Sequence, residues 1–175
     1  MPELPEVEAQ RRTIEEATVG KQITALVAVE QGGGPRDGLF DDKVIGEGVA
    51  SELLKSSLQK RWVIGVRRRG KQLWLELAEA RGGACTGCLL LHFGMTGAVI
   101  VRGVAAPLYK SFEIDDRAWP PRFTKLEIVL SGDVRLAYAD PRRFGRILLR
   151  GADPFTQVRV RVRVRVRVSV RVRVG

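Results

Sequence analysis

Several features are scarce or missing in this chain of 175 residues, and each absence excludes a class of protein. Two cysteines, Cys85 and Cys88, are too few for the disulfide framework of a small secreted domain, which favours an intracellular, reducing setting. No apolar run approaches the roughly 20 residues that a membrane-spanning helix needs. The first residues carry acids where a secretory signal would be basic and then apolar. We therefore expect a soluble protein that has no membrane partner.

The composition suits one globular domain. Hydrophobic residues make up 45% of the chain and charged residues 29%, which excludes a fibrous or wholly disordered protein. The formal net charge of +10 is concentrated in residues 158–174, which contain seven arginines and no acidic residue. Without those seven, 23 of the 30 basic residues remain against 20 acidic ones, a net charge of +3. The net charge of residues 1–157 is therefore weak evidence for nucleic-acid binding, and the positions of their basic residues have to provide it.

Residues 158–175 alternate valine and arginine with a period of two and differ in kind from the rest of the chain. One interpretation is a basic arm that binds nucleic acid. We favour another, in which a short nucleotide repeat has been read through and translated, because a single strand of this length would far exceed the usual five or six residues. The expected organisation is one domain over residues 1–157 and a low-complexity tail over residues 158–175.

The hydrophobic pattern predicts one helix followed by short strands. Pro5 suits a first helical turn and Gly20 a helix end. The side of the helix that we expect to be buried carries Leu4, Val7, Ile14 and Ala17. Strands are predicted at 23–29, 62–67, 72–77, 89–93, 98–101, 126–130, 134–138 and 147–149. The predicted fold class is therefore mainly β with one N-terminal helix, an antiparallel β-sandwich or flattened barrel of about eight strands.

Pro2, Glu3 and Glu6 are the first candidates for chemistry. A small residue at position 2 normally allows removal of the initiator methionine, which would leave the secondary amine of Pro2 free. An α-amino group titrates at ~7.7–8, so part of it is unprotonated at neutral pH, and such an amine can attack a sugar C1′ as a covalent nucleophile. Glu3 is adjacent, and Glu6 shares the same side of a first helical turn. The alternative is an ordinary terminus without a catalytic role.

Three further segments place glycine turns beside cations or aromatic residues: RRRGKQLWLEL at 67–77, HFGMTG at 92–97 and DPRRFG at 140–145. Lys71 occupies a tight turn that suits contact with a phosphate, although a solvated hairpin is the ordinary interpretation. A core histidine followed by a packing methionine would likewise explain the second segment. Methionine and phenylalanine with an arginine between them suit a protein that unstacks a duplex and fills the gap.

Together with PELPEVE at the start, these segments resemble the formamidopyrimidine-DNA glycosylase family and its endonuclease VIII-like relatives, in the family's order and at nearly its spacing. The stretch 103–123 is more similar to the plant and fungal members. The resemblance covers about residues 1–155 and implies the family's N-terminal β-sandwich domain. It also implies a base-excision-repair glycosylase that removes oxidised purines, such as 8-oxoguanine and formamidopyrimidines, and then cleaves the abasic strand by β,δ-elimination.

The resemblance implies catalytic roles for four residues. Pro2 would form the Schiff base at C1′ of the damaged nucleotide, and Glu3 would protonate the sugar ring oxygen. Glu6 would help to position the base or a water molecule. Lys71 would lie beside the lesion and its phosphate.

Four other residues would contact DNA. Met95, Arg142 and Phe144 would fill the gap left by the flipped base, with Arg142 facing the unpaired cytosine, and would offset part of the cost of flipping. His92 would contact a phosphate or stabilise its turn. The expected partner is damaged double-stranded DNA, bound by a monomer. The expected location is the nucleus in a eukaryote, and otherwise the cytoplasm and nucleoid.

The family's second half, which carries a helix-two-turn-helix and a zinc or zincless finger, has no counterpart in this sequence. We expect no cofactor and no metal, because a four-ligand zinc site needs two ligands besides Cys85 and Cys88, and only His92 is at hand. Three functions stay open: a bifunctional glycosylase and lyase, a truncated, non-catalytic DNA-binding remnant of one, and a structural β-domain. The motifs disfavour the last, and borohydride trapping distinguishes the first two.

Overall fold

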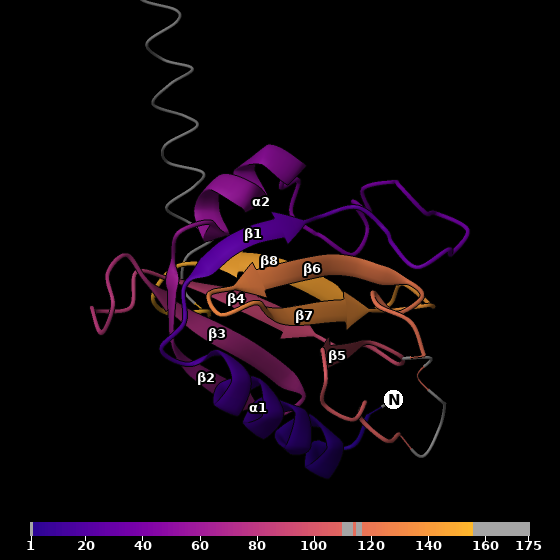
Figure 1. Cartoon of the computed structure of the whole chain (residues 1–175), viewed down its shortest axis with the longest axis horizontal. Coiled ribbons are helices and arrows are strands. Elements are labelled where there is room, and N and C mark those ends of the chain that lie inside the picture. The colour runs from indigo at the N-terminus through magenta and orange to yellow at the C-terminus, as the bar shows by residue number, and fades with distance from the viewer. Residues whose placement is uncertain (1, 110–113, 115–116, 156–175) are drawn as a thin grey trace, which may run out of the picture.

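The computed structural model describes residues 2–109, 114 and 117–155 (Figure 1). The predicted tail at 158–175 lies outside the described residues. Within them the chain contains two helices and eight strands. The strands are β1 Ile23–Val27, β2 Trp62–Arg69, β3 Gln72–Ala78, β4 Gly87–His92, β5 Ala98–Val101, β6 Thr124–Leu130, β7 Val134–Ala139 and β8 Arg146–Arg150.

The strands form two antiparallel four-stranded sheets, one in the order β1-β6-β7-β5 and the other in the order β2-β3-β4-β8. The two sheets face each other (Figure 1), and one apolar core, to which both sheets contribute, fills the space between them. The two helices, α1 over Leu4–Thr18 and α2 over Ser51–Leu58, lie at opposite margins of this sandwich (Figure 1). The predicted β-sandwich with an N-terminal helix is confirmed.

Helix α1, Leu4–Thr18, begins with Pro5 in its first turn and ends before Gly20, as expected. Its buried side carries Val7, Gln10, Ile14 and Thr18. The prediction that Leu4 is buried is wrong, since Leu4 is 47% exposed. At 100° per residue, Leu4 lies about 80° from the centre of the buried stripe and therefore at its margin.

Helix α2, Ser51–Leu58, was not expected. Five of its eight residues are polar, the helix is too short to show a helical period, and only Leu54 and Leu58 are buried. These two leucines are four residues apart and therefore share one face. The helix contacts β1, so packing on the sandwich stabilises a segment that is too short to form a helix alone.

Candidate functional site

The predicted catalytic residues at the start of the chain meet in the first turn of α1. Pro2 is buried, and Glu3 is the residue that precedes the helix. The backbone N–H of Glu3 donates to a carboxylate oxygen of Glu6 at 2.5 Å. This capping contact holds the two acids side by side at the positive end of the helix dipole, where carboxylates are stabilised.

Gln10 anchors the first half of α1 to the opposite sheet. Its side-chain oxygen accepts the backbone N–H of Val99 in β5 at 2.8 Å, and its amide nitrogen donates to the hydroxyl of Tyr109. The Tyr109 hydroxyl in turn donates to the carbonyl oxygen of Gly97 at 2.8 Å. Burial raises the pKa of Tyr109, which keeps this hydroxyl a donor. The start of α1 is thereby tied to the segment that carries Met95.

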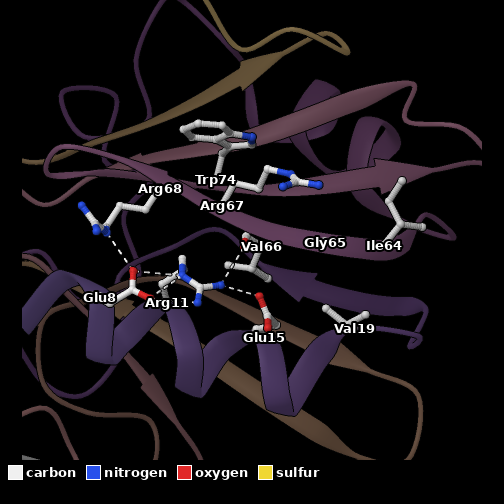
Figure 2. A pocket seen from close by; sticks show the side chains of 10 residues that line it. All are labelled: Glu8, Arg11, Glu15, Val19, Ile64, Gly65, Val66, Arg67, Arg68 and Trp74. Atoms are coloured by element: carbon white, nitrogen blue, oxygen red, sulfur yellow. Dashed lines mark hydrogen bonds and ion pairs between the residues drawn. The ribbon is translucent and has the colours of Figure 1, made fainter.

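Glu8 and Arg68 tie the same part of α1 to the turn that contains Lys71. The Arg68 guanidinium donates to the Glu8 carboxylate at 2.8 Å (Figure 2). It also donates to the carbonyl oxygen of Gly70 at 3.1 Å. Hydrogen bonds from Arg11 and then from Arg68 lower the pKa of Glu8 to about 2. Gly70 has a φ of +59°, a conformation that favours glycine, and Lys71 follows it as an exposed residue.

A groove of about 500 Å³ lies between α1 and β2 (Figure 2). Its lining includes Glu15 and Val19 from the far end of α1, and Ile64 from β2. None of the eight predicted site residues lines it. The groove is therefore separate from the eight predicted site residues, and its lining comes mainly from β2, with Glu8, Arg11 and Glu15 from the ion-paired face of the helix.

The three residues predicted to fill a DNA gap lie on two interlocked loops. Asp140 is fully buried, and its carboxylate accepts the hydroxyl of Thr96 and the backbone N–H of Gly145, both at 2.8 Å. Gly94 packs so closely that an added Cβ would lie 2.6 Å from the carbonyl carbon of Phe144. Since the loops at 93–97 and 140–145 are joined in this way, they present their exposed side chains as one unit.

Met95, Arg142 and Phe144 project from these loops. Met95 is 39% exposed and Phe144 is 45% exposed, so two large apolar side chains lie at the surface of the joined loops. The guanidinium carbon of Arg142 lies 5.4 Å from the centre of the Phe144 ring, and the ammonium of Lys43 lies 5.3 Å from it. The structure thus places Arg142 beside Phe144, and it adds Lys43, which no sequence motif indicated.

A cluster of charged residues, Glu30, Asp41, Lys125 and Arg143, holds the loop at 140–145 in place. The Arg143 guanidinium donates to both carboxylate oxygens of Asp41, at 2.7 and 3.0 Å, and Lys125 lies 3.0 Å from the same carboxylate. Burial alone would raise the pKa of Asp41, but hydrogen bonds from Arg143 and Lys125 hold it below its ordinary value. Lys125 also pairs with Glu30. No sequence pattern connects these residues, which lie up to 113 positions apart.

The strand register places the remaining predicted residues at the same end of one sheet. Gln72, where β3 begins, pairs with His92 at the end of β4, and His92 pairs with Arg146 at the start of β8. His92 is half-buried, and its carbonyl oxygen accepts the hydroxyl of Tyr138 at 2.9 Å. Lys71, His92 and the loop at 140–145 thus share what we call the site end of this sheet.

Asp140 and Gln10 are functional supports that sequence reasoning missed. Asp140 is the first residue of an Asp-Pro turn, and an aspartate in that position often accepts hydrogen bonds from the backbone of its own turn. Gln10 stands between Val7 and Ile14 on the apolar side of α1, and a polar residue in that position indicates a buried hydrogen bond.

Neither a metal site nor a membrane span is present in the part of the chain that the structure describes. Over residues 2–109, 114 and 117–155, no group of three or more His, Cys, Asp or Glu side chains gathers in a way that could hold an ion. No described helix is long and apolar enough to cross a membrane.

Residues 1–147 match the family model of the formamidopyrimidine-DNA glycosylase N-terminal domain. Curated relatives include two formamidopyrimidine-DNA glycosylases. The one from Arabidopsis thaliana is 36% identical over a match that covers 85% of this chain and 34% of the relative. The one from Escherichia coli strain 55989 is 36% identical over a match that covers 83% of this chain and 42% of the relative. This chain therefore spans less than half the length of the relatives it matches.

The solved structures that match are similar over the same portion. Wild-type Lactococcus lactis Fpg (MutM) with DNA containing N7-benzyl-Fapy-dG is 31% identical, with a TM-score of 0.58, over 87% of this chain and 45% of that one. Lactococcus lactis Fpg with DNA containing an abasic site is 30% identical, with a TM-score of 0.57, over 85% of this chain and 44% of that one.

Proposed function

Since this chain belongs to the formamidopyrimidine-DNA glycosylase family, we propose that its domain carries out base excision and strand cleavage at oxidised purines in duplex DNA. The observation that carries the proposal is the arrangement around the first turn of α1. Pro2 and the Glu3–Glu6 pair are tied through Glu8 and Arg68 to the Lys71 turn. Through Gln10, which lies in the second turn, α1 is also tied to the loops that expose Met95 and Phe144.

The chemistry begins once removal of Met1 frees the amine of Pro2. The nitrogen of Pro2 attacks C1′, the glycosidic bond breaks, and the base leaves as it takes up a proton. Glu3 gives a proton to the ring oxygen, so the sugar opens to an iminium ion joined to Pro2. This cation makes the C2′ hydrogen acidic, and two eliminations then release the 3′ and 5′ phosphates from the sugar.

The exposed loops supply the DNA-binding part of the proposal. Met95 and Phe144 are exposed apolar side chains on a rigid pair of loops, and Arg142 adds a planar donor beside them. Such a group enters the stack that a flipped base leaves and lowers the cost of the flipped state. The relatives crystallised with lesion-containing or abasic DNA support this partner.

Borohydride trapping on an abasic duplex tests the covalent step. Reduction of the iminium ion leaves a stable protein–DNA adduct, and peptide mapping of that adduct should place the link on Pro2. Pro2→Gly removes the ring that holds the secondary amine, so we expect it to lose most of the adduct, whereas the exposed Pro35→Gly serves as the matched control. An adduct that maps to a lysine, or equal yields from both variants, would overturn the assignment.

Glu3→Gln tests the proton donor separately. The amide keeps the shape of the carboxyl group but cannot give a proton, so excision should slow by about 100-fold or more while binding to an abasic duplex persists. Excision at the wild-type rate would remove Glu3 from the mechanism.

A non-catalytic DNA-binding remnant is the second candidate. The observation that supports it is the exposure of Met95 and Phe144, since these side chains could contact DNA without any reaction at Pro2. Preference for abasic over intact duplex without any trapped adduct would establish the remnant and refute the enzyme.

A further inference from the structure

Cys85 and Cys88 form a close pair at the end of the sheet opposite the site end. Their sulfur atoms lie 3.9 Å apart. Cys88 is 1% exposed and belongs to β4, while Cys85 is half-buried in the irregular stretch that precedes β4. A disulfide bond is about 2.05 Å long. The sulfurs must therefore approach by less than about 2 Å, and Cys85 stands on backbone that is outside the regular sheet.

Both sulfur atoms lie near the same backbone carbonyl. The carbonyl oxygen of Ala152 lies 3.8 Å from the sulfur of Cys85 and 3.7 Å from that of Cys88, and the Cys88 thiol donates to it. The single proton of the Cys85 thiol has a closer acceptor, the carbonyl oxygen of Gly87 at 3.3 Å. Ala152 follows β8, and the chain then places Phe155 against Trp74 with 5.5 Å between ring centres. The cysteine pair thus contacts residues 151–155, the segment that follows β8.

We propose that Cys85 and Cys88 are a redox modification site, at which a peroxide converts the two thiols into one intramolecular disulfide. The Cys85 thiolate attacks a peroxide oxygen, the O–O bond breaks, and Cys85 becomes a sulfenic acid as one water leaves. The Cys88 thiol then attacks the Cys85 sulfur and gives its proton to the departing hydroxide, so the S–S bond forms and a second water leaves. Two thiols and one hydrogen peroxide thus give one disulfide and two waters.

The order of the two steps follows from exposure. Peroxide reaches the half-buried Cys85 before the fully buried Cys88. Burial, together with the neighbouring Cys85, Glu76 and Asp153, raises the pKa of Cys88. Cys88 is therefore unreactive by itself and acts only when a sulfenic acid forms beside it.

Oxidation also changes the hydrogen bonding of Ala152. The disulfide has no S–H group, so the Ala152 carbonyl loses the hydrogen bond from Cys88. The segment over residues 151–155 should then exchange its amide hydrogens faster, because a hydrogen bond that holds it against β4 is gone. The site end lies at the other end of β4, so this modification is independent of the proposed DNA chemistry.

The full chain and its single-cysteine variants test the proposal. Treated with a small excess of hydrogen peroxide, the wild type should lose both thiols together and about 2 Da of mass, remain monomeric on a non-reducing gel, and recover both thiols with dithiothreitol. Cys88→Ser should instead stop at a Cys85 sulfenic acid, which a sulfenate-specific reagent traps. Cys85→Ser should keep its remaining thiol.

Two results would overturn the proposal. One is a wild type in which Cys85 is oxidised to sulfinic acid while Cys88 keeps its thiol, and the other is a disulfide between chains. Hydrogen–deuterium exchange tests the consequence at Ala152. Faster exchange of residues 151–155 in the oxidised wild type, and not in peroxide-treated Cys85→Ser, supports the coupling. Unchanged exchange in a fully oxidised chain refutes it.

Discussion

Asp41→Asn is expected to be among the most destabilising single substitutions in the described domain. The Asp41 side chain is fully buried, receives two hydrogen bonds from Arg143 and lies 3.0 Å from the ammonium of Lys125. Removing one partner of a buried ion pair costs about 3–5 kcal/mol, because the remaining charge stays buried without compensation. Glu30 still pairs with Lys125, so we expect the lower part of this range, about 3 kcal/mol.

Urea denaturation measures this loss as a change in the free energy of unfolding. Asp133→Asn is the matched control, since Asp133 pairs with Arg135 at 3.0 Å but its side chain is 68% exposed. A surface pair of this kind contributes less than about 1 kcal/mol. A loss below about 1 kcal/mol for Asp41→Asn, or equal losses for the two variants, would refute the argument from burial.

The same variant should alter the acid limb of the stability curve. The folded-state pKa of Asp41 lies below its unfolded value, so its charge contributes stability above about pH 4 that is lost as the pH falls further. The asparagine side chain of the variant cannot titrate, so the free-energy difference between wild type and variant should shrink below about pH 4. A constant difference down to the acid transition would show that the charge of Asp41 is not the source of the effect.

Three further predictions concern the loops, the helix and the tail. Gly145→Ala should destabilise the domain by about 1–3 kcal/mol in urea denaturation, because its Cβ would collide with the hydroxyl oxygen of Tyr138 and lie 2.7 Å from the carbonyl oxygen of His92. Glu8→Gln should be less stable than wild type at neutral pH in thermal unfolding. That difference should narrow from pH 4.5 towards pH 2, since the pKa of Glu8 falls from 4.5 to about 2 in the folded chain. Deleting residues 158–175 should weaken the salt dependence of duplex binding. In salt titrations, the slope of log affinity against log salt concentration should become less steep by about 0.9 for each phosphate that the tail neutralises. The preference for an abasic over an intact duplex should stay unchanged.

The local pattern of the chain was enough to predict most of the fold. Short β-like runs bounded by glycine-rich or charged turns located the eight strands of the described residues, with ends that moved by at most two residues. Pro5 and Gly20 located the ends of α1 within about two residues. These features are visible because strand and helix periods depend on neighbours in the sequence. Helix α2 was missed, because eight residues carry too few turns for a period to appear.

The segments of the candidate site were visible in the sequence, but the way they are held together was decided by the tertiary structure. PELPEVE, HFGMTG and DPRRFG are local motifs, so the residues that we propose for chemistry and DNA contact could be named from the chain alone. Their supports join positions far apart. Gln10 reaches Val99 across 89 positions, and Asp41 reaches Arg143 across 102. Such contacts depend on the packing of the two sheets and α1, and no local period of the chain encodes them.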